Sequence, residues 1–228
     1  MALKIVRILV FLTFPIGFLY CTPLMGQEKD AGLWTSFSFE AKVVKKLTAS
    51  LEQGFRFNEN ISELGQIYTE AGLDYKLSKH FGVAASYRFI QKRKVEDYYS
   101  YVNRFTIAVK YEKKWKPYQL KFKSSLQDQY ADIGRATDGG IPEFYWRNKV
   151  SFSREMEKPY SPYIYAELFS LLDYPRAYAF AGVRCAAGIE YAFTKHHKIE
   201  LYYMIQKELN VSNPKTDFIL GFGYSYKL

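Results

Sequence analysis

Charged side chains of both signs recur at every second position along several long segments of the sequence. In residues 46–57, Glu52 and Arg56 alternate with Leu51 and Phe55. Successive side chains of a β-strand point to opposite faces, so this spacing places the two charges on one face and the apolar residues on the other. Carboxylates and guanidinium groups that share a face can pair with each other or line a path for polar solutes.

The same alternation extends this charged face along most of the chain. If the segments close into a barrel, the residues predicted to line its lumen are Glu52, Arg56, Glu70, Asp74, Arg88, Arg104, Lys110, Lys121, Lys123, Arg147, Lys149, Glu167, Arg184 and Glu190. Two interpretations stay open, a salt-bridged plug that fills a narrow barrel and a narrow selective pathway. Both signs occur on neighbouring segments, which favours the plug, with Glu52, Arg56, Glu70 and Arg88 as its central members.

Other chemistry finds little support in the sequence. The three histidines, His80, His196 and His197, fall in expected turns, and a His-His pair lacks the third and fourth ligands that a metal site needs. No histidine falls mid-strand on the charged face, where a catalytic triad would need orienting partners. Phosphate-binding loops, dinucleotide fingerprints, Cys-x-x-Cys pairs and calcium loops are absent from the sequence. We therefore predict no catalytic residue, no metal, no cofactor and no enzymatic activity.

The elements that must position these charges are long strands. Alternation predicts eleven of them, at residues 33–42, 46–57, 67–76, 81–91, 103–113, 118–127, 144–154, 162–170, 182–193, 199–207 and 217–228. Most reach the ~9–11 residues with which a tilted strand crosses a bilayer. Short basic turns alternate with longer polar loops at 58–66, 92–102, 128–143, 172–179 and 208–216. Short periplasmic turns and long extracellular loops are the layout of an outer-membrane barrel.

We therefore predict an all-β fold, an antiparallel up-and-down transmembrane β-barrel of 10–12 strands. An odd count conflicts with the even number usual in bacterial barrels. A further strand could lie in 128–143 or before Leu33, or residues 27–32 could thread the lumen. The alternative is a soluble periplasmic or secreted β-protein, which would bury the apolar face and expose the charged one.

The N-terminus differs from the rest of the chain. Lys4 and Arg7 precede an apolar run over residues 8–20, and small or turn-forming residues follow. We predict a cleaved signal peptide at 1–26 and a single barrel domain at 27–228. The apolar run is short for a transmembrane anchor, and Tyr20 is too bulky to precede a lipidated Cys21.

Composition agrees with a membrane barrel and argues against nucleic-acid binding. Aromatic residues make up 18% of the chain, with 21 Tyr and 18 Phe, and barrels place such residues in girdles at the two membrane interfaces. The formal charge is +9, but the basic residues are spread over turns and the charged face rather than gathered in one exposed stripe. Basic and aromatic residues at strand ends can instead meet anionic lipid headgroups.

Several segments resemble an uncharacterised family of outer-membrane β-barrels, domain of unknown function 2490. They are 32–38 as first strand, 45–47 through 52–57, and 72–75 followed by 81–88. The resemblance covers nearly all of the chain after residue 26. It implies an outer-membrane location and assigns no activity, so no catalytic residue is carried over.

These observations predict a non-enzymatic barrel in the outer membrane of a Gram-negative organism, with a structural role or a narrow channel or transport role. The expected partners are outer-membrane lipid or lipopolysaccharide, the barrel-assembly machinery, and a small solute or ion. Two alternatives stay open. One is a surface receptor or adhesin that binds through its long loops, 128–143 above all, and the other is a lipid-modifying enzyme.

Overall fold

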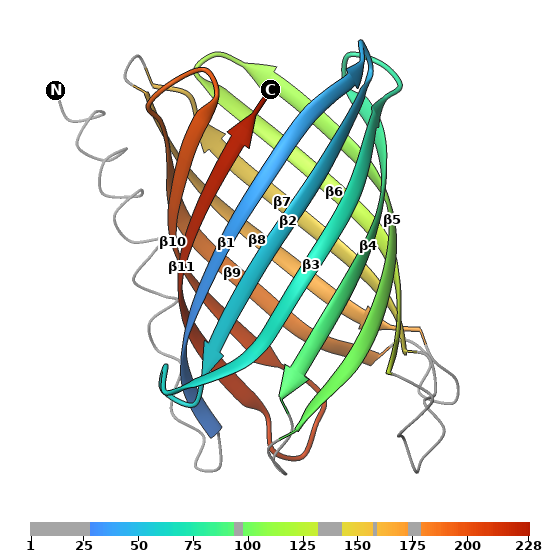
Figure 1. Ribbon diagram of the computed structural model, residues 1–228, viewed down its shortest axis with the longest axis vertical. Coiled ribbons are helices and arrows are strands. Elements are labelled where there is room, and N and C mark those ends of the chain that lie inside the picture. Colours follow the sequence, from blue (N-terminus) through green and yellow to red (C-terminus); the bar gives the residue numbers. More distant parts are fainter. Residues whose placement is uncertain (1–27, 94–97, 132–142, 157–158, 173–178) are drawn as a thin grey trace, which may run out of the picture.

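The computed structural model describes residues 28–93, 98–131, 143–156, 159–172 and 179–228. These residues form eleven strands that close into one barrel (Figure 1). The predicted signal peptide lies outside the described residues and stays a prediction. The described residues contain no helix that is long and apolar enough to cross a membrane.

The strands lie where the alternation predicts them, and most extend further. They are β1 (Glu28–Val44), β2 (Leu47–Asn58), β3 (Glu63–Lys76), β4 (Phe81–Arg93), β5 (Tyr99–Trp115), β6 (Tyr118–Ala131), β7 (Glu143–Arg154), β8 (Tyr160–Leu171), β9 (Ala179–Ala192), β10 (His197–Glu208) and β11 (Lys215–Lys227). Each contains at least 12 residues, enough to cross a bilayer at a tilt.

The odd strand number is accommodated by one parallel pair. Strands β1 and β11 pair in parallel, from Glu28 opposite Lys215 to Glu40 opposite Lys227, and all the remaining neighbouring pairs are antiparallel. Residues 28–32 therefore continue β1, and the expectation that they might thread the lumen is wrong. Within 128–143, the described residues belong to β6 and β7, and 132–142 lie outside the described part of the chain.

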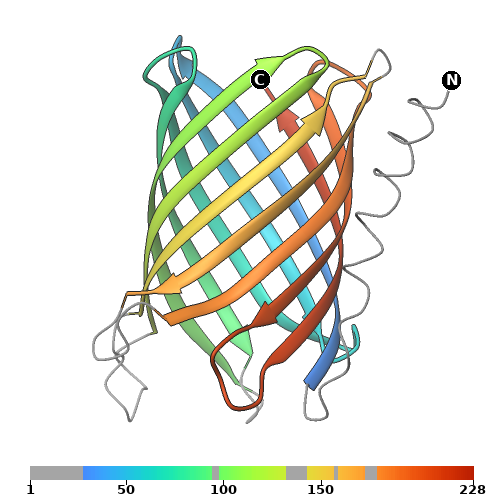
Figure 2. The same ribbon diagram turned by 180° about the vertical axis from the view of Figure 1, so that it is seen from behind.

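The connections gather at two ends of the barrel. Turns 45–46, 77–80, 116–117 and 193–196 lie at one end, together with the C-terminus. The opposite end, which we call the long-loop end, carries the turns 59–62 and 209–214, the strand ends that flank residues 94–97, 132–142 and 173–178, and the start of β1 (Figures 1 and 2). The prediction of a long loop at 58–66 is wrong, because β3 already begins at Glu63 and the connection is short. Residues Glu59, Asn60 and Ile61 instead form a tight turn with positive φ.

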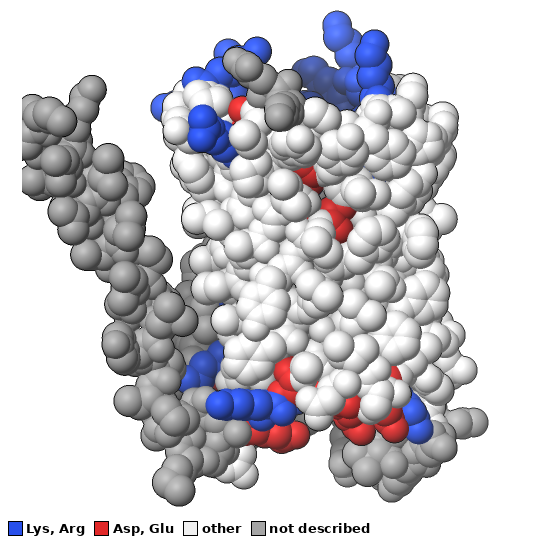
Figure 3. All heavy atoms as spheres, turned by 90° about the vertical axis from the view of Figure 1, so that its left-hand side faces the viewer, with Lys and Arg blue, Asp and Glu red and all other residues white. Residues whose placement is uncertain are grey.

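The apolar faces of the strands point outward. Only seven hydrophobic side chains are buried among the described residues, whereas every strand exposes large hydrophobic ones, such as Ile107 at 61% and Ile164 at 58%. On the face seen in Figure 3, charged side chains gather at the two rims, and the band between them is mostly uncharged, with a few acidic atoms in its upper part. Exposure of such an apolar surface to water is unfavourable, whereas contact with the hydrocarbon of a membrane is favourable. The soluble alternative, with the apolar face inside, is therefore wrong.

Aromatic pairs border this apolar band. At the end with the short turns, Phe39 stacks on Tyr226 and Tyr118 stacks on Phe152. Phe89 stacks on Tyr101 nearer the long-loop end. Aromatic rings at both interfaces are the girdles of transmembrane barrels.

Candidate functional site

The lumen contains a cavity of about 730 Å³ that reaches the long-loop end, and all eleven strands contribute to its wall. The predicted residues that line it are Arg56, Glu70, Arg88, Arg104, Lys123, Arg147, Glu167 and Arg184. The alternation explains this convergence, because the inward-facing positions of every strand in a closed barrel share one interior.

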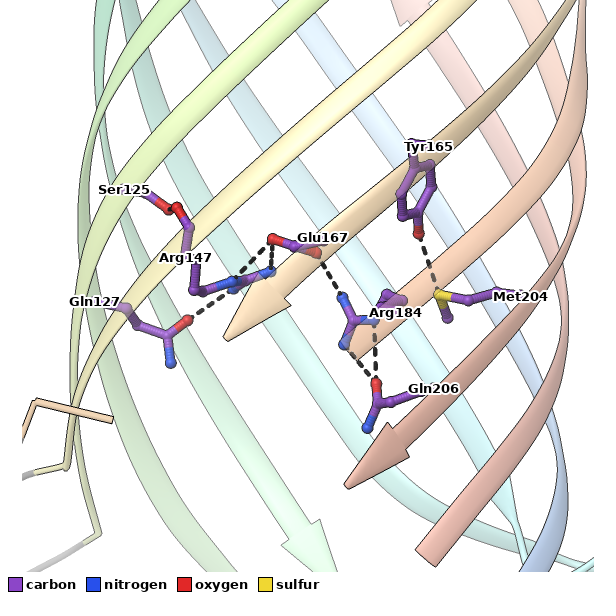
Figure 4. Close-up of polar contacts among 8 residues, drawn as sticks. All are labelled: Ser125, Gln127, Arg147, Tyr165, Glu167, Arg184, Met204 and Gln206. Atoms are coloured by element: carbon purple, nitrogen blue, oxygen red, sulfur yellow. Dashed lines mark hydrogen bonds and ion pairs between the residues drawn. The ribbon is translucent and has the colours of Figure 1, made fainter. Parts of the chain in front are cut away.

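Glu167 on β8 joins two arginines from neighbouring strands (Figure 4). Its Oε1 accepts hydrogen bonds from Arg147 Nε at 3.0 Å and Nη2 at 2.7 Å, and its Oε2 lies 3.3 Å from Arg184 Nη1. Only 6% of Glu167 is exposed. Gln127 and Gln206 accept further guanidinium hydrogen bonds. A buried carboxylate held by two guanidinium groups fixes this part of the wall.

A second cluster lies on β2, β3 and β4. Arg88 Nε donates to Glu70 Oε2 at 2.6 Å, and Arg88 Nη2 lies 3.7 Å from Glu52 Oε1. The Tyr68 hydroxyl donates to the same Glu52 oxygen at 2.6 Å, and the Arg88 guanidinium lies 3.8 Å from the centre of the Tyr68 ring. Three of the four residues predicted as central, Glu52, Glu70 and Arg88, thus form one ion-paired group.

The fourth, Arg56, has no carboxylate partner among the described residues. Its guanidinium lies 3.7 Å from the centre of the Trp34 ring and 5.1 Å from that of Tyr68, both cation–π contacts. Within the described part of the chain, Arg56 makes one long hydrogen bond, from Nη1 to Gln66 Oε1 at 3.4 Å, and its buried Nε has no partner. Arg104 is similar, because its Nε and Nη2 both donate to the neutral amide oxygen of Gln129.

Aromatic and apolar side chains narrow the lumen beside these charges. Met204 and Ile219 are 1% exposed and pack with Trp34, Tyr165 and Tyr202. The Tyr165 hydroxyl lies 3.1 Å from Met204 Sδ. This cluster fills part of the interior with aromatic and apolar side chains.

Glycines allow tyrosine rings to lie flat against the wall. A Cβ on Gly54 would lie 2.2 Å from Tyr68 Cζ, and one on Gly221 would lie 1.9 Å from Tyr202 Cζ. Each glycine is directly opposite its tyrosine on the neighbouring strand. The missing side chain therefore makes room for a ring that would otherwise project across the lumen.

The remaining predicted residues share the inward face but do not line the cavity. Asp74 pairs with Lys110, Glu190 lies 3.1 Å from Lys198, and the Lys149 ammonium lies 3.5 Å from the centre of the Tyr165 ring. Lys121 is exposed. The interior thus holds both ion pairs and open space, and whether it is plugged or conducting stays a prediction.

Metal binding finds no support in the described residues, which contain no group of three or more His, Cys, Asp or Glu side chains suited to an ion. His80 and His196 lie at the short-turn end, where their Nδ1 atoms contact the main-chain oxygens of Glu112 and Lys227. His197 Nδ1 lies 2.6 Å from the Tyr224 hydroxyl. These contacts anchor turns and strand ends.

The sequence reasoning missed the uncharged and terminal members of the site. Trp34, Gln127, Gln129 and Gln206 occupy the same alternate positions as the charges and were not counted as site residues. Alternation alone is enough to place these four residues in the lumen. Asp30 and Lys215, which form an ion pair of 3.1 Å at the edge of the cavity, carried no such signal because they lie outside the apolar alternation.

A closed barrel with an apolar exterior and a charged interior defines an outer-membrane-type β-barrel. Solved structures agree on this fold. The β domain of the Bordetella autotransporter BrkA is 10% identical with a TM-score of 0.55, over 81% of this chain and 85% of that one. The NanC porin is 13% identical with a TM-score of 0.52, over 87% of this chain and 98% of that one. Comparison with curated proteins gives no match.

The chain belongs to the family described as protein of unknown function DUF2490, whose model matches residues 31–217. The resemblance seen in the sequence is therefore confirmed.

Proposed function

We propose that this protein is a non-enzymatic, narrow channel for small polar solutes in the outer membrane. The observation that carries the proposal is the cavity of about 730 Å³, lined by charged side chains from all eleven strands. Barrels of about 8 strands have interiors just filled by side chains, and those of 16–18 leave wide aqueous pores. Eleven strands lie between these limits, and the residual space agrees with a narrow path.

The long-loop end faces the outside of the cell in this proposal, and the short turns face the periplasm, as is usual for outer-membrane barrels. Lys45, Lys79 and Lys195 are exposed in the turns of the short-turn end, where their ammonium groups can approach anionic lipid headgroups. The porin among the solved neighbours is consistent with a channel, although that likeness supports only the fold. The receptor alternative relies chiefly on residues 128–143, most of which lie outside the described residues.

Single-channel conductance of the refolded full-length protein in a planar bilayer tests the proposal. Folding is checked first by faster migration of the unboiled sample on a denaturing gel. Tyr202→Ala removes one ring from the cluster that fills part of the lumen and so enlarges the open space, and we expect steady conductance that rises in this variant. Tyr203→Ala is the matched control, because Tyr203 is the next residue on β10, faces outward and is 50% exposed. Silence from both the folded wild type and folded Tyr202→Ala would overturn the channel.

A further inference from the structure

The cavity wall carries more positive than negative charge. Among the described residues, its lining contains nine lysines and arginines and six aspartates and glutamates. The lining therefore carries a formal charge of +3, and Glu52, 3.7 Å from Arg88 beside the cavity, offsets one of these charges. Such a field concentrates anions, because low-dielectric walls focus it on the space between them.

The pairing pattern shows where this excess resides. Glu70 holds Arg88, and Glu167 holds both Arg147 and Arg184, so these acids are already engaged. Among the residues that the structure describes, Arg56 contacts the Gln66 amide and the Trp34 and Tyr68 rings, and Arg104 donates to the Gln129 amide, with no carboxylate bound to either. Arg104 also lies within electrostatic range of Arg88, Arg56 and Arg147, all of the same sign, and of Glu70, which is already paired with Arg88. An anion placed among these guanidinium groups would relieve their mutual repulsion.

We propose that Arg56 and Arg104 form a binding site for a small solute that carries a carboxylate or a phosphate. A planar guanidinium presents parallel N–H donors that match the oxygens of either group. The Trp34 ring stacks on Arg56 and holds its guanidinium in place, so less conformational entropy is lost on binding. A cavity of about 730 Å³ is within the size range of small-molecule sites, so it accommodates an acid of monosaccharide size.

Titration calorimetry on the refolded full-length protein in non-ionic detergent tests the site. The probes are glucuronate for a carboxylate, inorganic phosphate for a phosphate, and glucose as the uncharged match to glucuronate. We expect saturable binding of at least one oxyanion and none of glucose. Loss of a charge-assisted hydrogen bond corresponds to about tenfold in affinity, so Arg104→Gln weakens binding by about that factor.

Two further variants separate the site from general charge effects. Lys121→Gln removes one positive charge from the same inward face but outside the cavity, and binding stays within about twofold of the wild type. Arg104→Lys keeps the charge and loses the planar fork, so its affinity falls between those of the wild type and Arg104→Gln. Equal losses in Arg104→Gln and Lys121→Gln, no saturable binding by the folded wild type, or equal binding of glucose would each overturn the proposal.

Selective transport of anions requires that the proposed channel exists, whereas oxyanion binding at Arg56 and Arg104 does not depend on the channel. Reversal potentials in a KCl gradient measure selectivity, and we expect chloride to be preferred over potassium, less so in Arg104→Gln. Oxyanion binding by a barrel that does not conduct would refute the channel and support the site. Conductance without anion preference and without oxyanion binding would refute the site and support the channel.

Discussion

Replacement of Glu167 by glutamine should destabilise the barrel more than the loss of an exposed ion pair would. The carboxylate is 6% exposed and accepts hydrogen bonds of 2.7, 3.0 and 3.3 Å from Arg147 and Arg184. Glutamine keeps the shape and one acceptor but leaves two guanidinium charges without an anion. We expect a loss of about 3 kcal/mol, the low end for a broken buried ion pair, because Gln127 and Gln206 still accept from the arginines.

Urea unfolding of the protein in lipid vesicles, followed by tryptophan fluorescence, measures this loss by linear extrapolation. Glu190→Gln is the matched control. Glu190 also faces the lumen and pairs with Lys198 at 3.1 Å, but the two side chains are 36% and 41% exposed. Its removal should cost at most about 1 kcal/mol. If Glu167→Gln proved no more destabilising than Glu190→Gln, the cluster would not be desolvated and the reasoning would fail.

Two further predictions concern the wall and its faces. Gly54→Ala should push the Tyr68 ring off the wall, lowering stability by about 1–3 kcal/mol and reducing conductance, whereas Gly223→Ala, with a nearest contact of 3.3 Å, should change both measurements little. Cys185 faces outward, so in vesicles it should react with a lipid-soluble maleimide and not with a charged one. Arg184→Cys, with the two natural cysteines replaced, should react with the charged reagent. Mass spectrometry that showed the reverse pattern would invert the assigned faces.

The strands and their two faces could be predicted from the sequence because alternation is a local property. Leu51 and Glu52 point to opposite faces whatever their neighbours do, so a correct period places every side chain of a strand inside or outside. Alternation therefore predicts that Arg88 and Arg147 share one interior, although it says nothing about their contacts. This explains why the predicted lumen residues share the inward face.

The partners of each charge could not be predicted, because they depend on register. Pairing between β2 and β3 shifts at Arg56 and Phe57, a bulge that breaks the alternation and hid the start of β3 at Glu63. Residues 28–32 carry no apolar alternation and become strand through pairing with β11. Pairing between strands that are distant in sequence therefore sets the length of β1. It also determines which arginines of the described residues have no carboxylate partner.

The parallel seam between β1 and β11 has a consequence for the polypeptide as a whole. With eleven strands, Glu28 lies at the long-loop end and Leu228 at the opposite rim, so the chain makes one net crossing of the bilayer. Reporters fused at these two points would sit in different compartments, unlike those on a barrel with an even number of strands. The barrel thus resembles a single-pass membrane anchor in its topology, because its first and last described residues lie at opposite rims.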